Sequence, residues 1–333
     1  MSLLKRFFKQ KKCFVNPHAL FIRRSIIDVI LWKVGFYDDK FKNANPPLGF
    51  TFPIPCEELK GSALKAQWMT HSSYLVNAFD FTFLTDPVWS DRCSPISFLG
   101  PKRKMNPPCT LQDLPLLDCI LISHNHYDHL DKTTIKQIIK YHPGAIFIVP
   151  QGVKKWFERL RVKQVIELSW WESVDLPLSK TSSTQVKITA VPAQHFSGRG
   201  FFDFNKSHWC GYVVEIQTAS ERKRCYFAGD TGYNSVDFKE IQKKWPYMDL
   251  SLIPIGCYSP RVFMAPVHID PWDAISIHIE VNSRLSLATH WGTFSLGDEG
   301  MYRPPYDLYC FLKERDVDVQ SFLAPMPEHE IHW

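Results

Sequence analysis

The sequence lacks several features that would assign it to common classes of protein. Its nine cysteines contain no C-x-x-C pair, and their odd number argues against a cysteine-ligated zinc site and for a reducing compartment. No G-x-S-x-G motif is present, so the serine nucleophile of that motif is excluded. No short-period repeat or low-complexity tract appears either. We therefore expect a globular, cytoplasmic protein whose chemistry needs no nucleophilic side chain.

The N-terminal region also lacks the marks of a signal peptide and of a transmembrane helix. The first residues, MSLLKRFFKQKK, are basic but have no apolar core and no small-residue cleavage site. The apolar run that follows is broken by charges at Arg23, Arg24, Asp28 and Lys33, so it is too interrupted to span a bilayer. Its apolar positions have helical spacing: Leu20, Ile27, Ile30, Leu31 and Val34. They predict a helix that either packs on the main domain or lies on a membrane surface.

What is present is an ordinary balance of charge with many aromatic residues. The chain has 333 residues, 45% of them hydrophobic and 14% aromatic, enough for a large core or an apolar pocket. Its net charge of +5 permits contact with phosphates or an anionic surface. The internal basic cluster, GPKRKMNPP, is short, and we interpret it as a solvated loop. We therefore expect no nucleic-acid partner.

The pattern of elements predicts an α/β fold in one main domain. A proline-rich stretch from Asn45 to Pro55 suggests that residues 1–60 form an arm and connector, and that the main domain spans residues 61–333. Short strands open the domain, and apolar strands then alternate with helices in both halves. This order predicts two sheets covered by outer helices.

One loop concentrates residues that bind metals. LISHNHYDHLD places His124, His126, Asp128 and His129 between an apolar strand and a helix whose N-cap would be Asp131. Imidazole and carboxylate groups are ligands suited to zinc and similar metals. On an extended stretch, His124 and His126 point the same way and can bind one ion. Asp128 and His129 can then face a neighbouring ion, so further ligands must come from elsewhere.

Three other strands end in a residue of the same kind. His195 follows ITAVPAQ, Asp230 follows CYFAG, and His290 follows LSLAT. Burying several unpaired polar groups costs free energy unless a metal or other partners satisfy them. A carboxylate such as that of Asp230 can bridge two cations with its two oxygens. These residues predict a metal site at the strand ends.

The motifs SHNHYDHLD, AQHF, FAGDTGY and ATHWGTF, in this order, resemble the metallo-β-lactamase superfamily. With FLTDPVW, ELSWWE, LIPIGCYSPRVFM and HIDPWDA, they resemble more narrowly the N-acylphosphatidylethanolamine-hydrolysing phospholipase D group, from about Gln67 to Thr293. The resemblance implies a four-layer αβ/βα sandwich and two zinc ions. It implies that His124, His126 and His195 bind the first ion, that Asp128, His129 and His290 bind the second, and that Asp230 bridges them.

The resemblance also implies a function. Two cations about 3.5–4 Å apart can share and acidify a water, which supplies hydroxide at neutral pH. The expected reaction is phospholipase D-type hydrolysis of an N-acylphosphatidylethanolamine-like phospholipid to phosphatidic acid and N-acylethanolamine. Asp230 and His268 are the expected catalytic residues, and Tyr127 and His268 the expected contacts to the substrate phosphate. Without the resemblance, Tyr127 is equally a packing aromatic and His268 a helix cap.

Several points stay open at this stage. His71 and Asp86 follow early strands and either orient ligands or form turns. Val267 departs from the amide side chain that the resemblance predicts, and FSGRGFFDFNKSHW (residues 196–209) matches only in outline, so acyl and headgroup specificity are open. The alternatives are a lactone or ester hydrolase of the same fold, a non-catalytic metal-binding protein and, more weakly, a diiron redox protein. We also consider a homodimer and peripheral attachment to membranes.

Overall fold

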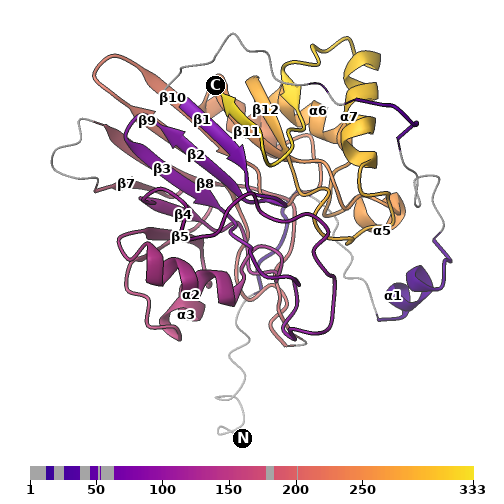
Figure 1. Ribbon diagram of the computed structural model, residues 1–333, viewed down its shortest axis with the longest axis horizontal. Helices are drawn as coiled ribbons and strands as arrows, with labels where there is room; N and C mark the ends of the chain where they lie inside the picture. The colour runs from indigo at the N-terminus through magenta and orange to yellow at the C-terminus, as the bar shows by residue number, and fades with distance from the viewer. Residues whose placement is uncertain are drawn as a thin grey trace, which may run out of the picture.

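A computed structural model describes residues 13–18, 26–37, 46–51, 53, 64–177, 184–200 and 202–333. Within these residues, two seven-stranded sheets face each other (Figure 1). The first has the order β14-β1-β2-β3-β4-β5-β6, and the second β13-β12-β11-β10-β9-β8-β7.

The strands of the first sheet are β1 (Leu64–Trp68), β2 (Tyr74–Ala78), β3 (Phe81–Thr85), β4 (Cys119–Leu121), β5 (Ile146–Pro150), β6 (Val165–Leu168) and β14 (Glu330–His332). Those of the second are β7 (Ser173–Leu176), β8 (Gln185–Val191), β9 (Gly211–Gln217), β10 (Arg222–Phe227), β11 (Met248–Pro254), β12 (Ser283–Thr289) and β13 (Phe322–Leu323). In each sheet, antiparallel pairs are followed by parallel pairs, which begin at β3–β4 and at β10–β11. The two halves of the chain therefore repeat one arrangement.

Helices cover the outer face of each sheet. They are α2 (Lys132–Tyr141), α3 (Lys154–Glu158), α4 (Asp237–Lys244), α6 (Pro271–Glu280) and α7 (Arg303–Glu314). Two other helices are the short α5 (Arg261–Met264) and α1 (Ile26–Lys33), and α1 lies to one side of the sandwich (Figure 1). Ile135 and Ile138 of α2 pack with Ile120 and Phe147 of the first sheet. A separate and larger hydrophobic core lies between the two sheets, where Phe83 and Tyr212 are fully buried. The expected four-layer αβ/βα sandwich is confirmed.

Residues 13–18 and α1 lie against this sandwich. Trp32 of α1 donates its indole N–H to Asp298 Oδ2 at 2.6 Å and packs on Phe263. The predicted apolar face does not pack as a whole, because Ile27, Ile30 and Val34 are exposed. Leu20 lies outside the described residues. In the described part of the chain, no helix is both long and apolar enough to cross a membrane.

The basic cluster GPKRKMNPP differs from expectation at one residue. Lys102 and Lys104 are exposed, but Arg103 is buried. Its guanidinium donates to Thr70 Oγ1 and to the Val88 carbonyl, both at 2.6 Å. The interpretation of this cluster as a solvated loop is therefore wrong for Arg103, because the β1–β2 turn and the loop after β3 supply partners for its charge.

Candidate metal centre

The first group of predicted ligands converges on one point. His124 and His126 follow β4, and His195 follows β8. His124 Nε2 lies 2.8 Å from His126 Nδ1, which lies 3.2 Å from His195 Nε2. Burial is the main cause that lowers the pKa of His126 to about 3, and the neighbouring histidines add to it. Burial also lowers the pKa of His195 to about 4. It lowers the pKa of His124 well below its ordinary value, so the three rings are neutral at physiological pH, as metal ligands must be.

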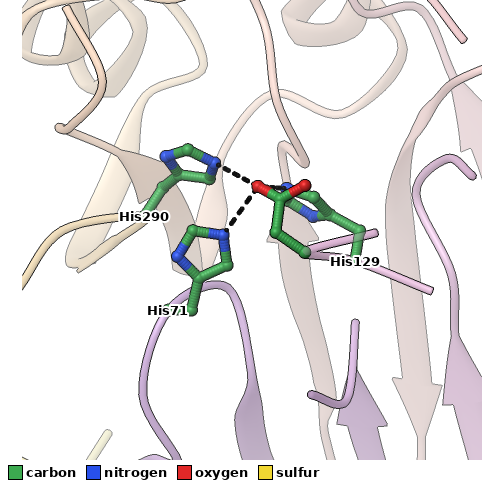
Figure 2. A group of neighbouring side chains, drawn as sticks. His71, His129 and His290 are labelled. Atoms are coloured by element: carbon green, nitrogen blue, oxygen red, sulfur yellow. Dashed lines mark hydrogen bonds and ion pairs between the residues drawn. The ribbon is translucent and has the colours of Figure 1, made fainter. Parts of the chain in front are cut away.

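The second group surrounds the carboxylate of Asp128. Asp128 Oδ2 lies 3.4 Å from both His129 Nε2 and His290 Nε2. It also lies 3.1 Å from the Nε2 atom of His71, in the turn between β1 and β2. Figure 2 shows the rings of His71, His129 and His290, which come from distant parts of the chain, converging on one carboxylate.

Asp230 lies between the two groups. Its Oδ2 is 3.1 Å from both His129 Nε2 and His290 Nε2, and 3.9 and 3.8 Å from the Nε2 atoms of His124 and His195. Gly229, before it, has φ +62, and a Cβ there would meet Ser123 Cβ at 2.7 Å. Glycine thus lets the loop after β10 approach the loop after β4. This approach places Asp230 beside the ligands predicted after β4, and His195 and His290 join the same cluster from the ends of β8 and β12.

Hydrogen bonds orient two histidines of the first group. His195 Nδ1 lies 2.9 Å from the Val267 carbonyl, which can only accept. The Ser123 hydroxyl donates to Asp86 Oδ2, so at 2.9 Å it accepts from His124 Nδ1. In both rings the proton therefore sits on Nδ1, and the lone pair on Nε2 faces the cluster. This arrangement of outer partners is typical of metal-binding histidines.

Asp86 and His71 contact predicted ligands, as expected if they orient those side chains. Asp86 Oδ2 accepts from His129 Nδ1 at 2.6 Å. Asp86, His71 and His290 all have positive φ, of 30°, 53° and 61°. Left-handed backbone is costly for residues with a Cβ and tends to be retained at functional sites. All three residues with this backbone direct their side chains into the cluster.

The donor set fits metal ions. The Nε2 lone pairs of His124 and His195 point at His126 Nδ1, and a single proton on that nitrogen cannot satisfy both. Among the described residues, Asp230 Oδ1 is buried without a hydrogen-bond partner, and His129 Nε2 and His290 Nε2 contact Asp230 Oδ2 at 3.1 Å without the geometry of a hydrogen bond. Such atoms are costly to bury alone, and cations at these positions would satisfy them.

The charges of the second group point the same way. Burial alone would lower the pKa of His290, but Asp230 and Asp128 raise it to about 9. Burial also opposes a charge on His129, yet Asp230, Asp128 and Asp86 raise its pKa well above the ordinary value. Protons thus compensate two buried carboxylates here, and a metal ion would take their place and release them.

Tyr127 is held by a residue that sequence reasoning missed. The Arg199 guanidinium lies 3.8 Å from the centre of the Tyr127 ring, and the Tyr127 hydroxyl donates to the Arg199 carbonyl at 3.2 Å. Arg199 Nη1 also donates to the carbonyls of Asn125 and Leu130, both at 2.8 Å. Arg199 therefore braces the loop that carries four predicted ligands. Its only signal in the sequence was its place in the loosely matching stretch.

His268 faces both groups of ligands. Its Nδ1 lies 3.9 Å from Asp230 Oδ2, and its ring centre lies 5.1 and 5.3 Å from those of His195 and His290. Its side chain is 12% exposed, whereas those of His195 and His290 are 1% exposed. His268 is therefore more open to an incoming molecule than the predicted ligands beside it. Val267, where the resemblance predicts an amide side chain, contacts His195 through its backbone carbonyl and not through its side chain.

Comparisons with known proteins agree with this geometry. The family profile described as "Beta-lactamase superfamily domain" matches residues 82–291. The chain is 43% identical over 265 residues to N-acyl-phosphatidylethanolamine-hydrolyzing phospholipase D 1 of Caenorhabditis elegans, covering 78% of this chain and 72% of that protein. It is 35% identical over 258 residues to the mitochondrial N-acyl-phosphatidylethanolamine-hydrolyzing phospholipase D of Saccharomyces cerevisiae, covering 76% of this chain and 53% of that one.

A solved structure supports the fold. Igni18, a metallo hydrolase from the archaeon Ignicoccus hospitalis, superposes with a TM-score of 0.57 over 80% of this chain and 97% of its own, at 18% identity. The layered fold, the histidine–aspartate cluster and the relatives lead to one assignment. The chain belongs to the metallo-β-lactamase superfamily and is a metal-dependent hydrolase.

Proposed function

We propose that this protein is a phospholipase D-type hydrolase that cleaves N-acylphosphatidylethanolamine-like phospholipids to phosphatidic acid and N-acylethanolamine. The observation that carries the proposal is the position of Asp230 between two ligand groups. His124, His126 and His195 would hold one zinc ion, and Asp128, His129 and His290 a second, with Asp230 shared by both. When bound, such a pair of ions activates water and stabilises charge on a phosphoryl group.

The chain's own residues would bind and orient the phosphodiester. Burial, first, and the neighbouring histidines lower the pKa of His268 well below its ordinary value, so its ring is neutral. A neutral ring with one N–H can donate to a phosphate oxygen. The Tyr127 hydroxyl already donates to Arg199, so it would have to exchange that bond to donate to a substrate. His268 is therefore the better-placed of the two predicted substrate contacts.

An exposed apolar loop beside the site suits a lipid. It borders a cavity of about 620 Å³ whose lining is mostly polar and includes the cations Arg92, Lys132 and Arg199 and the carboxylates Asp91 and Asp131. Ser94, Pro95 and Ser97 also line it, and the same loop exposes Ile96, Phe98 and Leu99 by 41%, 80% and 60%. Apolar side chains beside cationic ones favour contact with an anionic bilayer. We include peripheral membrane contact in the proposal, from the cytoplasmic side.

The decisive experiment follows oxygen from water. Zinc-loaded protein is incubated with vesicles containing N-acylphosphatidylethanolamine in ¹⁸O-water, and the products are analysed by mass spectrometry. Attack of water at phosphorus adds its oxygen to phosphatidic acid and its proton to the departing N-acylethanolamine. We therefore expect one ¹⁸O atom in phosphatidic acid and none in N-acylethanolamine.

The same measurement tests the alternative. Label in a free fatty acid, with the phosphodiester intact, would support the ester-hydrolase alternative and reject ours. Asp230→Asn is the matched control, because it keeps the shape of the side chain and removes its charge. Labelled phosphatidic acid at the wild-type rate from a preparation of that variant that has lost its metal would mean that a contaminating enzyme is responsible.

A further inference from the structure

Residues 13–18, here called the N-terminal strap, cross the loop that follows β8 and carries His195. Asn16 Nδ2 donates to the His195 carbonyl at 2.8 Å, and the His195 amide donates to Asn16 Oδ1 at 3.1 Å. One side-chain amide thus satisfies both backbone groups of a predicted ligand. It does so without a strand partner, because β8 ends at Val191.

The strap also reaches the residues that follow His195. The Phe14 amide donates to the Asn205 carbonyl at 2.9 Å, and Asn205 Nδ2 donates to the Phe14 carbonyl at 3.1 Å. Asn205 in turn donates its amide to the Ser197 carbonyl at 2.9 Å and accepts the Ser197 amide on Oδ1 at 3.1 Å. The Phe14 ring stacks on His208, with centres 4.3 Å apart.

A second chain of contacts leads to the residue before His195. His18 Nδ1 lies 2.8 Å from Asp237 Oδ1. Asn234 Nδ2 donates to Asp237 Oδ2 at 2.7 Å and to Gln194 Oε1 at 3.1 Å. The strap therefore holds the 194–197 segment directly at His195 and through one or two intermediates on either side.

From these contacts we infer that the strap completes the metal centre, with Asn16 as a positioning residue for His195. The His195 ring is aimed by two constraints. The Val267 carbonyl fixes Nδ1, and Asn16 fixes the backbone, so Nε2 stays 3.2 Å from His126 Nδ1. Without Asn16, the amide and the carbonyl of His195 lose these two hydrogen bonds, and the backbone from which the ring extends is no longer held in place. The inference rests on the metal centre of the proposed function and is independent of its substrate.

The test compares two neighbouring strap residues in the full chain. Asn16→Ala removes both hydrogen bonds, whereas Val15→Ala trims a side chain that is 68% exposed. Zinc affinity is measured by competition with a chelator, and ligand geometry by the visible spectrum of the cobalt-loaded protein. Losing a partner that orients a ligand weakens metal binding about 10- to 100-fold. We expect a loss in that range and an altered cobalt spectrum for Asn16→Ala, and neither for Val15→Ala.

Wild-type affinity and an unchanged cobalt spectrum in Asn16→Ala would overturn the inference and leave the proposed function standing. Wild-type protein that binds no zinc would overturn both. If Asn16→Ala does not fold, hydrogen exchange on the unmodified protein decides. Because coupling between two sites is reciprocal, removing zinc should speed exchange of the His195 and Phe14 amides. Equal exchange with and without zinc would refute the inference.

Discussion

Burial and the neighbouring histidines act in opposite directions on the carboxyl group of Asp230. Burial would raise the pKa of its carboxyl, but His129 and His290 lower it well below the ordinary value. Among the described residues, Asp230 Oδ1 has no hydrogen-bond partner. A buried carboxylate of this kind is held by positive charge alone, so neutralising it should affect both ligand groups at once.

We therefore predict that Asp230→Asn loses both metals and activity together. A ligand should matter more than a residue that only supports one, so we expect a fall in kcat/KM of at least about 100-fold. Elemental analysis after dialysis should show less than half of the wild-type metal content, because the loss of one ion alone would leave half. A variant that keeps its full metal content and its activity would contradict the bridging role.

Residues away from the site also carry a measurable charge effect. Burial, first, and Arg315 lower the pKa of His278 in α6 to about 4. The unfolded chain takes up a proton at His278 near pH 6.5, and the folded chain does not. The contribution of His278 to the free energy of unfolding is therefore fully present above pH 6.5 and is lost as the pH drops toward 4. The loss approaches about 3 kcal/mol.

His278→Gln should flatten this dependence. Glutamine can still bond to Ser286 Oγ, which lies 2.8 Å from His278 Nδ1, but it does not titrate. Urea unfolding at pH 7, 6 and 5 measures the difference from wild type, which should shrink as pH falls. A constant difference across these pH values would show that His278 does not cause the acid instability.

At the scale of elements, the loops depend on partners that sequence patterns do not reveal. The alternation of strands and helices predicted both sheets. The strand-end residues predicted the histidine–aspartate cluster, because parallel strands present their carboxyl ends at one edge. Arg199 escaped prediction since its partners are backbone carbonyls, which any sequence supplies. β14 escaped because its three residues pair with β1 at the other end of the chain.

Arg199 gives the prediction at this scale. Arg199→Ala should leave the carbonyls of Asn125 and Leu130 unpaired, lowering the free energy of unfolding by about 2–3 kcal/mol and weakening zinc binding. Arg222→Ala is the matched control, because Arg222 is exposed at the start of β10. Urea denaturation and chelator competition measure both effects. Equal behaviour of the two variants would mean that Arg199 does not brace the metal-binding loop.

At the scale of the whole molecule, the N-terminal region has two separable parts. The sequence left open whether it packs on the domain or lies on a membrane, because its charges and apolar residues suit both. Residues 13–18 pack beside His195, whereas α1 touches the sandwich through Trp32 and exposes Ile27 and Ile30. Removing residues 1–40 would therefore disturb the metal centre along with any membrane contact.

A shorter deletion separates the two roles. Residues 1–12 contain Lys5, Arg6, Lys9, Lys11 and Lys12 and end before the strap. Basic residues near anionic lipid contribute about 1 kcal/mol each, so their loss should reduce turnover of phospholipid in anionic vesicles by 10-fold or more. A small soluble phosphodiester should be hydrolysed at the wild-type rate, since Asn16 still holds His195. Sedimentation with vesicles measures binding directly. Unchanged vesicle binding and turnover would show that the N-terminal charges do not contribute to membrane contact. The proposed contact would then depend on α1 and on the loop of residues 94–100.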